Sequence, residues 1–130
     1  MAKLFSFTKQ ERLKSKKQID TLFQTGKAFF YFPFHVKYTI ELNVEQAGIH
    51  FGVSIPKRYF KKAILRNRLK RQSRESFRLQ KNNLKTKLTE QGKLLSIMFI
   101  YSHQQLCNYE GINIAMSECL KKIYDEIQAN

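Results

Sequence analysis

Apolar and polar residues alternate most regularly between Phe34 and Glu41. The apolar positions are Phe34, Val36, Tyr38 and Ile40, and His35, Lys37, Thr39 and Glu41 alternate with them. A period of two residues is typical of a strand with one buried face. Pro33 interrupts an aromatic and β-branched stretch that extends from Ala28 to Leu42, so we expect two short strands or a bend there.

A helical pattern precedes these strands. Ser15 and Gln18 have the spacing of a capping box, in which Ser15 is the N-cap and Gln18 reaches back to it. We expect a short helix that ends at Gly26. Its apolar residues share one face and are Ile19, Leu22 and Phe23.

The rest of the chain predicts four further elements around turns. After a turn at 43–48 they are a strand at 49–55, a long helix at 62–91 that frays after Asn82 and Asn83, a strand at 94–101 and a helix after an Asn108 N-cap. The strand at 94–101 is almost continuously apolar, which favours a central position in the sheet. The apolar residues of the last helix recur at helical spacing and are Ile112, Met116, Cys119, Leu120, Ile123 and Ile127. The order α-β-β-β-α-β-α predicts a sheet with helices packed on it.

Length and charge narrow the class of protein. The 130 residues contain no linker or repeat, so we expect one domain over 1–130, with 1–11 as a flexible arm. Lys and Arg number 24 against 10 Asp and Glu, a net charge of +14 that predicts a polyanionic partner, nucleic acid first. No apolar stretch is long enough for a membrane span or a signal peptide, and we expect a cytoplasmic protein.

Cysteine and histidine add no site of their own. Cys107 and Cys119 lack metal-ligand or redox spacing, so we expect two reduced thiols in or near the core. His35, His50 and His103 lie far apart and are expected to be ordinary strand and loop residues.

The segment 57–81 carries most of the excess charge. Its cations are Lys57, Arg58, Lys61, Lys62, Arg66, Arg68, Lys70, Arg71, Arg74, Arg78 and Lys81, and its one acid is Glu75, which gives +10. At about 100° per residue, Leu65, Leu69, Gln72, Ser76 and Leu79 share one side of the helix, with Ile64 and Phe77 near its edges. The opposite side holds Asn67, Lys70, Arg71, Arg74, Arg78 and Lys81, flanked by Arg66 and Arg68. Like charges at this spacing repel unless phosphates neutralise them, so we interpret this side as a nucleic-acid contact rather than a solvated face.

A cluster of aromatic residues surrounds the first strands. Its members are Phe23, Phe29, Phe30, Tyr31, Phe32, Phe34 and Tyr38. We expect most of them in the core. A few exposed on the sheet would form a stacking platform for single-stranded nucleic acid.

These segments together resemble the bacterial ribonuclease P protein subunit. The resemblance rests on 51–58 (FGVSIPKR), on 63–71 (AILRNRLKR) with Arg74, and on Arg12–Lys14, Leu22–Phe23 and Gly26. It extends from about Arg12 to Ile127, and the Arg66-Asn67-Arg68 signature within a basic helix is its most specific part.

The resemblance implies a fold and a set of contacts. The fold would be a two-layer α/β sandwich with a left-handed β-α-β crossover, against the usual right-handed rule. The protein would bind a catalytic RNA through Arg66, Asn67, Arg68, Lys70, Arg71 and Arg74. It would hold the 5′ leader of precursor tRNA in a cleft with Ile19, Phe23, Tyr38 and Arg58, while Lys57, Lys61, Lys62 and Arg78 would add phosphate contacts. Ile19 stands where relatives often have Phe, and the loop at 59–62 is longer and more basic than usual.

The implied function is leader removal from precursor tRNA by a ribonucleoprotein. Hydrolysis would be carried out by Mg²⁺ bound to the RNA, with no cofactor on the protein and no catalytic side chain. An independent nuclease is the rival within enzymes, but Glu41, Glu45, Glu75 and Glu90 form no metal motif. A general or ribosome-associated RNA-binding protein is the alternative outside that class.

Overall fold

The computed structural model describes residues 11–13, 15–42 and 44–129, and most of the arm expected at 1–11 lies outside them. The elements are α1 (Lys16–Thr25), β1 (Lys27–Tyr31), β2 (Phe34–Glu41), β3 (Gly48–Ser54), α2 (Ala63–Gln80), α3 (Asn82–Glu90), β4 (Leu94–Tyr101) and α4 (Tyr109–Ala129). Their order confirms the predicted sequence of elements, apart from a break in the long helix. In the part of the chain described, no helix is long and apolar enough to cross a bilayer.

The four strands form one mixed sheet in the order β1-β2-β4-β3. β1 and β2 are an antiparallel hairpin around Pro33, and β2 also pairs antiparallel with β4. β4 therefore lies inside the sheet, as its apolar sequence predicted. β3 and β4 are parallel neighbours joined through α2 and α3, which makes a crossover connection whose left hand stays a prediction.

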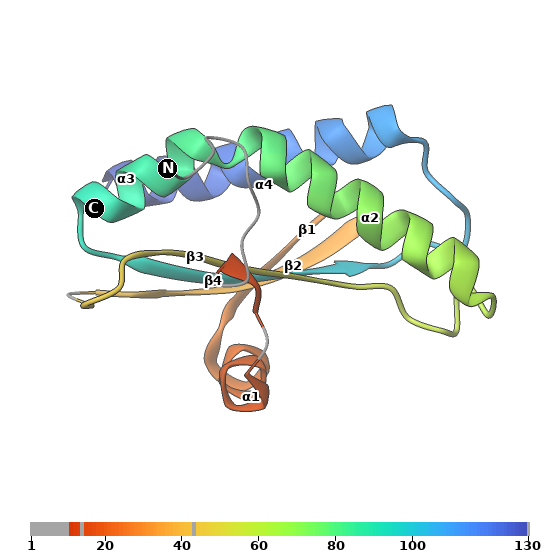
Figure 1. The fold of residues 1–130 in the computed structure, drawn as a ribbon, viewed down its shortest axis with the longest axis horizontal. Helices are drawn as coiled ribbons and strands as arrows, with labels where there is room; N and C mark the ends of the chain where they lie inside the picture. Colours follow the sequence, from red (N-terminus) through yellow and green to blue (C-terminus); the bar gives the residue numbers. More distant parts are fainter. Residues whose placement is uncertain (1–10, 14, 43, 130) are drawn as a thin grey trace.

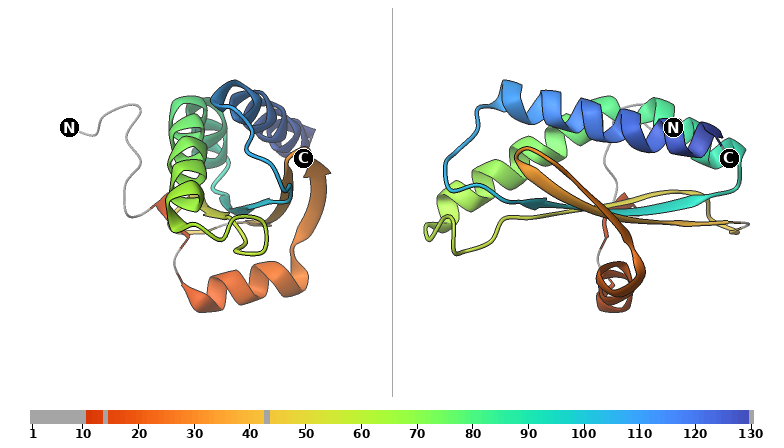
Figure 2. Two further views of the ribbon diagram at one scale, coloured as in Figure 1. Left: turned by 90° about the vertical axis from the view of Figure 1, so that its right-hand side faces the viewer. Right: turned by 180° about the vertical axis from the view of Figure 1, so that it is seen from behind.

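Helices cover the two faces of the sheet unequally. α2, α3 and α4 form a layer on one face, and α1 crosses the other face alone (Figure 1). The views from the side and from behind show the same arrangement, with α1 isolated beneath the sheet (Figure 2). Much of the sheet face around α1 is therefore not covered by another helix.

The main core lies between the sheet and the three-helix layer. Phe34, Val36 and Tyr38 of β2 point into it, which confirms the predicted alternation. The predicted apolar positions of α4 are all buried there. A smaller cluster beneath the sheet joins Leu22 of α1 to Leu13 and Met98, and Ile19 packs against it.

Close backbone approach explains why α1 ends at a glycine. A Cβ on Gly26 would lie 2.4 Å from the Leu22 carbonyl oxygen and 3.1 Å from that of Tyr38. No larger residue fits this contact between α1 and β2. At the other end, Ser15 accepts the Gln18 backbone N–H as predicted, but the Gln18 side chain contacts His50 instead of reaching back. Asn108 likewise accepts the Gly111 N–H at the start of α4.

Some expectations about helix boundaries and burial were wrong. The helix predicted at 62–91 is interrupted at Lys81. On α2, Ser73 and Phe77 are buried, whereas Leu79, which was predicted on the apolar side, is exposed. Four of the seven clustered aromatic residues are exposed rather than in the core, namely Phe23, Phe30, Tyr31 and Phe32. The physical reason is that β1 is an edge strand and α1 covers little of the sheet.

Candidate nucleic-acid interface

The outward side of α2 presents a dense group of cations. Arg68, Arg71 and Arg74 are exposed with Asn67, and Lys70 is half-buried beside them. Among the described residues, no carboxylate forms an ion pair with any of these four cations. An open pocket of about 500 Å³ is lined by Arg12, Asn67, Lys70, Arg71, Arg74, Glu75 and Arg78. We call Asn67, Arg68, Lys70, Arg71 and Arg74 the basic face.

Two cations predicted on this side have carboxylate partners instead. Arg78 forms a bidentate ion pair with Glu75 one turn earlier on α2. Lys81 is only 1% exposed, and its Nζ donates to both carboxylate oxygens of Glu11 at 2.6 Å. The prediction that Lys81 faces solvent was therefore wrong. Burial lowers the pKa of Lys81, and the Glu11 carboxylate opposes that shift.

The Glu11–Lys81 pair also fixes the position of Arg12. Glu11 is buried at the break between α2 and α3, with Lys85 Nζ 3.3 Å from the same carboxylate. Arg12 forms an isolated parallel bridge with Phe51, and the Leu13 N–H donates to the Phe51 carbonyl. The chain is thus held from both sides of Arg12, and Arg12 lines the pocket of the basic face.

Arg66 organises the loop before α2 rather than standing free. Its Nη1 donates to the carbonyl oxygens of Phe60 at 2.7 Å and Lys61 at 2.8 Å. These bonds close the loop that carries the exposed cations Lys57, Arg58, Lys61 and Lys62. Arg66 therefore shapes this part of the surface as well as adding charge to it.

Tyr38 does not line the surface beneath α1. Its side chain is buried on the opposite face of the sheet, and its hydroxyl donates to Glu126 of α4 at 2.9 Å. Burial, more than Glu126, raises the pKa of Tyr38 to about 12. The expectation that Tyr38 and Phe23 share a groove was wrong, because alternate residues of β2 face opposite layers.

Lys37, which sequence reasoning missed, occupies the position beneath α1. Its Nζ lies 4.8 Å from the centre of the Phe23 ring, and that ring is 43% exposed. Lys37 faces α1 because it is one residue away from Tyr38 on β2, a signal that was present in the alternation. Ile19 is half-buried against the small cluster beneath the sheet, and Arg58 stacks on Tyr59 in the loop after β3. The four residues expected in one cleft are therefore not brought together.

Comparisons with known proteins point to one family. The family model for ribonuclease P matches residues 7–124. Two Porphyromonas gingivalis proteins, each a ribonuclease P protein component, are 32% identical over 126 residues, which is 97% of this chain and 92% of theirs. The chain belongs to the ribonuclease P protein family.

Two solved structures of the Staphylococcus aureus RNase P protein have the same fold at 23% identity. One, at 2.0 Å, has a TM-score of 0.64 over 87% of this chain and 94% of its own. The other, a mutant with defective mRNA degradation activity, has a TM-score of 0.68 over 88% of this chain and 89% of its own. As a member of the ribonuclease P family, this chain acts as a protein subunit of the ribonucleoprotein endoribonuclease that processes the 5′ end of tRNA.

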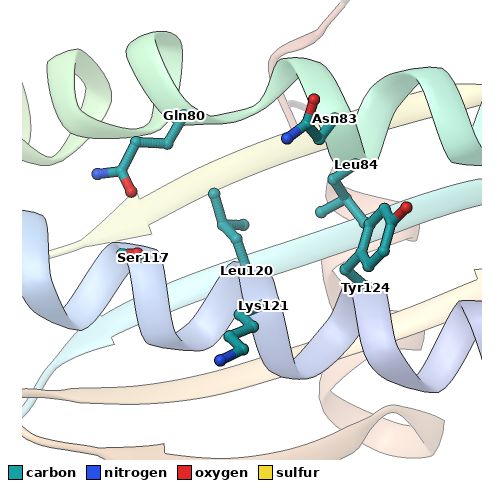
Figure 3. A pocket seen from close by; sticks show the side chains of 7 residues that line it. All are labelled: Gln80, Asn83, Leu84, Ser117, Leu120, Lys121 and Tyr124. Atoms are coloured by element: carbon teal, nitrogen blue, oxygen red, sulfur yellow. The ribbon is translucent and has the colours of Figure 1, made fainter.

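The remaining candidate sites of this chain carry few groups that could bind RNA. Within the described ranges, no group of three or more His, Cys, Asp or Glu side chains could hold a metal. Cys107 and Cys119 are free thiols, the second buried, as expected. A pocket of about 420 Å³ between α2–α3 and α4 is lined by Gln80, Asn83, Leu84, Ser117, Leu120, Lys121 and Tyr124 (Figure 3). Lys121 is the single cation in that lining, so this pocket lacks the charge density of the basic face.

Proposed function

We propose that this protein binds the catalytic RNA of ribonuclease P through the basic face and assists cleavage of precursor tRNA. The observation that carries the proposal is the row of exposed arginines on α2, which has no carboxylate partner among the described residues. Arginine binds phosphate bidentately through its planar fork. Such a row costs folding stability by repulsion, and phosphates of a bound RNA remove that cost.

The loop before α2 extends this RNA contact. Lys57, Lys61 and Lys62 are exposed there, and the loop is held in shape by Arg66. Lys62 is the N-cap of α2 and makes no capping bond through its side chain. The positive end of the helix dipole and these lysines together favour phosphate near the start of α2.

The protein's part in the reaction is electrostatic and positional. We assign the chemistry to Mg²⁺ bound by the catalytic RNA, where it would activate water and stabilise charge on the phosphate. The cations of the protein would lower repulsion between the two RNA molecules and hold precursor tRNA in place. We expect this assembly in the cytoplasm.

The leader of precursor tRNA is proposed to lie on the sheet face around α1. Phe23 offers an exposed ring for stacking, and Lys37 lies within reach of a phosphate next to it. Ile19 anchors α1 to the sheet rather than stacking on a base, because it packs against Leu13 and Met98. Arg58, on the loop after β3, would contact the backbone of the leader further along.

Equilibrium binding to the catalytic RNA tests the basic face. We expect Arg68→Ala and Arg71→Ala each to weaken binding by about 1–3 kcal/mol, the range for a lost charge-assisted contact. Lys121→Ala is the matched control, because it removes one exposed cation from α4 and should change binding little. Equal losses from all three variants would mean that only net charge matters, and the proposed face would be wrong.

Leader binding is tested separately by comparing precursor tRNA with mature tRNA. Phe23→Ala should lower affinity for the precursor by roughly 1–3 kcal/mol per lost stack and leave mature tRNA unaffected. Tyr38→Phe serves as the control, since it keeps the ring on the buried side and removes only the bond to Glu126. If Tyr38→Phe reduces leader discrimination and Phe23→Ala does not, the leader lies elsewhere.

A further inference from the structure

Two half-exposed phenylalanines lie beyond α1 at the tip of the β1–β2 hairpin. Phe30 and Phe32 are each 51% exposed. Phe30 pairs with His35 across the hairpin, so its side chain is on the same sheet face as Lys37 and Phe23. Burial cannot explain these two rings, because half of each remains in contact with water.

Each of these rings is held on one side by a histidine. The Phe30 and His35 ring centres are 4.8 Å apart, and the Phe32 and His103 ring centres are 4.7 Å apart. The Ser102 N–H donates to the Pro33 carbonyl at 2.8 Å, which fixes the loop after β4 against the hairpin tip. The two phenylalanine rings are therefore oriented by neighbours while much of their surface stays accessible.

The charge around the hairpin tip suits a polyanion. Residues 28–36, 54–62 and 102–108 contain no Asp or Glu, and the second of these segments contains Lys57, Arg58, Lys61 and Lys62. Arg58 lies over the Tyr59 ring at 4.9 Å in the second segment. Aromatic rings set among cations are the combination that single-stranded nucleic acid binds, through stacking and phosphate contact.

We propose that Phe30 and Phe32 form a second stacking site for single-stranded RNA at the hairpin tip, next to the sheet face that holds Lys37 and Phe23. The site extends the leader path past α1 to the hairpin tip, so that a longer leader gains contacts that a short leader lacks. This inference rests on the proposed leader contact at Phe23. The occupant is RNA rather than a protein strand, because the tip combines stacking faces with cations and has no acidic residue in its own segments.

Affinity for two precursor tRNAs tests the proposal with the holoenzyme reconstituted from this protein and the catalytic RNA. The two substrates carry a short and a long leader of related sequence. Phe30→Ala and Phe32→Ala should each lower affinity for the long leader by about 5- to 100-fold, as for loss of one stacked base. Affinity for the short leader should not change. Tyr31→Ala is the matched control, since Tyr31 is an exposed aromatic residue of the same strand on the opposite face.

Further variants separate stacking from folding. Phe32→Leu keeps apolar bulk without an aromatic face and should behave like Phe32→Ala, whereas Phe32→Trp should bind the long leader at least as well as the original protein. Loss of affinity for both leaders alike, or with Tyr31→Ala as well, would overturn the proposal. So would unchanged RNA affinity in Phe30→Ala and Phe32→Ala together with weakened self-association, which would make the tip a protein contact.

The same measurements separate this inference from the proposed function. If Phe23→Ala lowers affinity for both leaders and the hairpin variants have no effect, the leader contact at α1 stands and the second site is wrong. If Phe23→Ala has no effect on either leader, the proposed leader contact fails, and the second site fails with it.

Discussion

The cations of this protein differ in whether the fold gives them a partner. Lys81 and Arg78 are held by Glu11 and Glu75, and Arg66 is held by two carbonyl groups of its own loop. Arg68 and Arg71 are exposed on the same helix and have no carboxylate partner in the described part of the chain. Residue type alone therefore does not say which cations have partners within the protein, because the fold supplies the partners.

The buried Lys81–Glu11 pair should matter strongly for stability. Lys81→Met leaves the Glu11 carboxylate buried beside the more exposed Lys85, and we expect a loss of about 3 kcal/mol in the free energy of unfolding. Lys85→Met should cost less than about 1 kcal/mol, since its contact is partly in water. Urea unfolding measures both changes. Recovery of stability in the double variant Glu11→Leu/Lys81→Met would confirm that the stranded charge causes the loss, and equal effects of Lys81→Met and Lys85→Met would contradict it.

Arg66 should combine a structural and a binding effect. Arg66→Ala removes two hydrogen bonds to the loop before α2, so we expect a loss of roughly 1–2 kcal/mol in unfolding free energy as well as weaker binding to the catalytic RNA. Arg71→Ala should weaken RNA binding without that loss of stability. Thermal melting and RNA titration on the same samples distinguish the two. A stability change in Arg71→Ala as large as in Arg66→Ala would show that the distinction is wrong.

His50 should give the stability a specific pH dependence. Burial lowers the pKa of His50, with Glu41 opposing the shift, and its Nδ1 accepts from the Gln18 amide only when the ring is neutral. The folded state therefore binds this proton less readily than the unfolded state. The contribution is complete above the ordinary imidazole pKa of about 6.5 and is lost as the pH falls through the lower folded value.

Melting temperatures across this pH range provide the test. The fall in melting temperature on acidification should be smaller in His50→Gln than in the original protein. His35→Gln, which alters an exposed imidazole, should keep the original fall. An identical pH profile in all three proteins would exclude His50 as a source of the dependence.

At the scale of elements, the predicted strands β2 and β4 were confirmed because their sequence patterns reflect burial. Apolar residues alternate in β2 because one of its faces is buried, and they are continuous in β4 because both of its faces are buried. The same alternation indicated two faces for β2, yet it could not say which one α1 would cover. Tyr38 was therefore assigned to the wrong side, and Lys37 was missed.

The break between α2 and α3 depends on a distant contact. Lys81 is buried by Glu11, which lies 70 residues away in the sequence, and no local pattern reports such a pairing. The inward side of α2 was also predicted only in part, because Phe77 stacks on Phe51 at 4.0 Å and Leu79 is left outside. Periodicity indicated the helix and its charged side. Tertiary contacts determine where the helix breaks and which of its residues face the core.

The basic face of α2 should be visible in the salt dependence of RNA binding. If Arg71 contacts a phosphate, Arg71→Ala should reduce the slope of log affinity against log salt by about 0.7–0.9, since one fewer counterion is released. Arg78→Ala is a control within the same helix and should change the slope less, because Glu75 already neutralises Arg78. Binding measured at several salt concentrations gives both slopes. Equal slopes in the two variants would argue that the pairing of Arg78 is lost on binding.

At the scale of the whole molecule, the basic face and the exposed ring of Phe23 occupy different sides of one small fold. The basic face lies on the layer of α2, whereas Phe23 and Lys37 lie on the face that α1 crosses (Figure 1). Arg12 follows the buried Glu11 and lines the pocket beside α2, and Leu13 then packs with Leu22 of α1 beneath the sheet. If the catalytic RNA binds the basic face and the leader binds around α1, as we propose, the two RNA molecules contact different surfaces of the protein.

Three carboxylates of the protein form ion pairs with cations. They are Glu11, Glu75 and Glu126, and within the described ranges no group of three or more His, Cys, Asp or Glu side chains could hold a metal ion. Metal-dependent hydrolysis of a phosphodiester needs such a cluster to hold the ion. We therefore expect the purified protein, stripped of RNA, to leave precursor tRNA intact in Mg²⁺ at neutral pH. Adding the catalytic RNA should restore cleavage, and gel analysis of labelled precursor follows both reactions. Cleavage that survives rigorous RNA removal and disappears in a carboxylate variant such as Glu90→Gln would show that the protein is itself a nuclease.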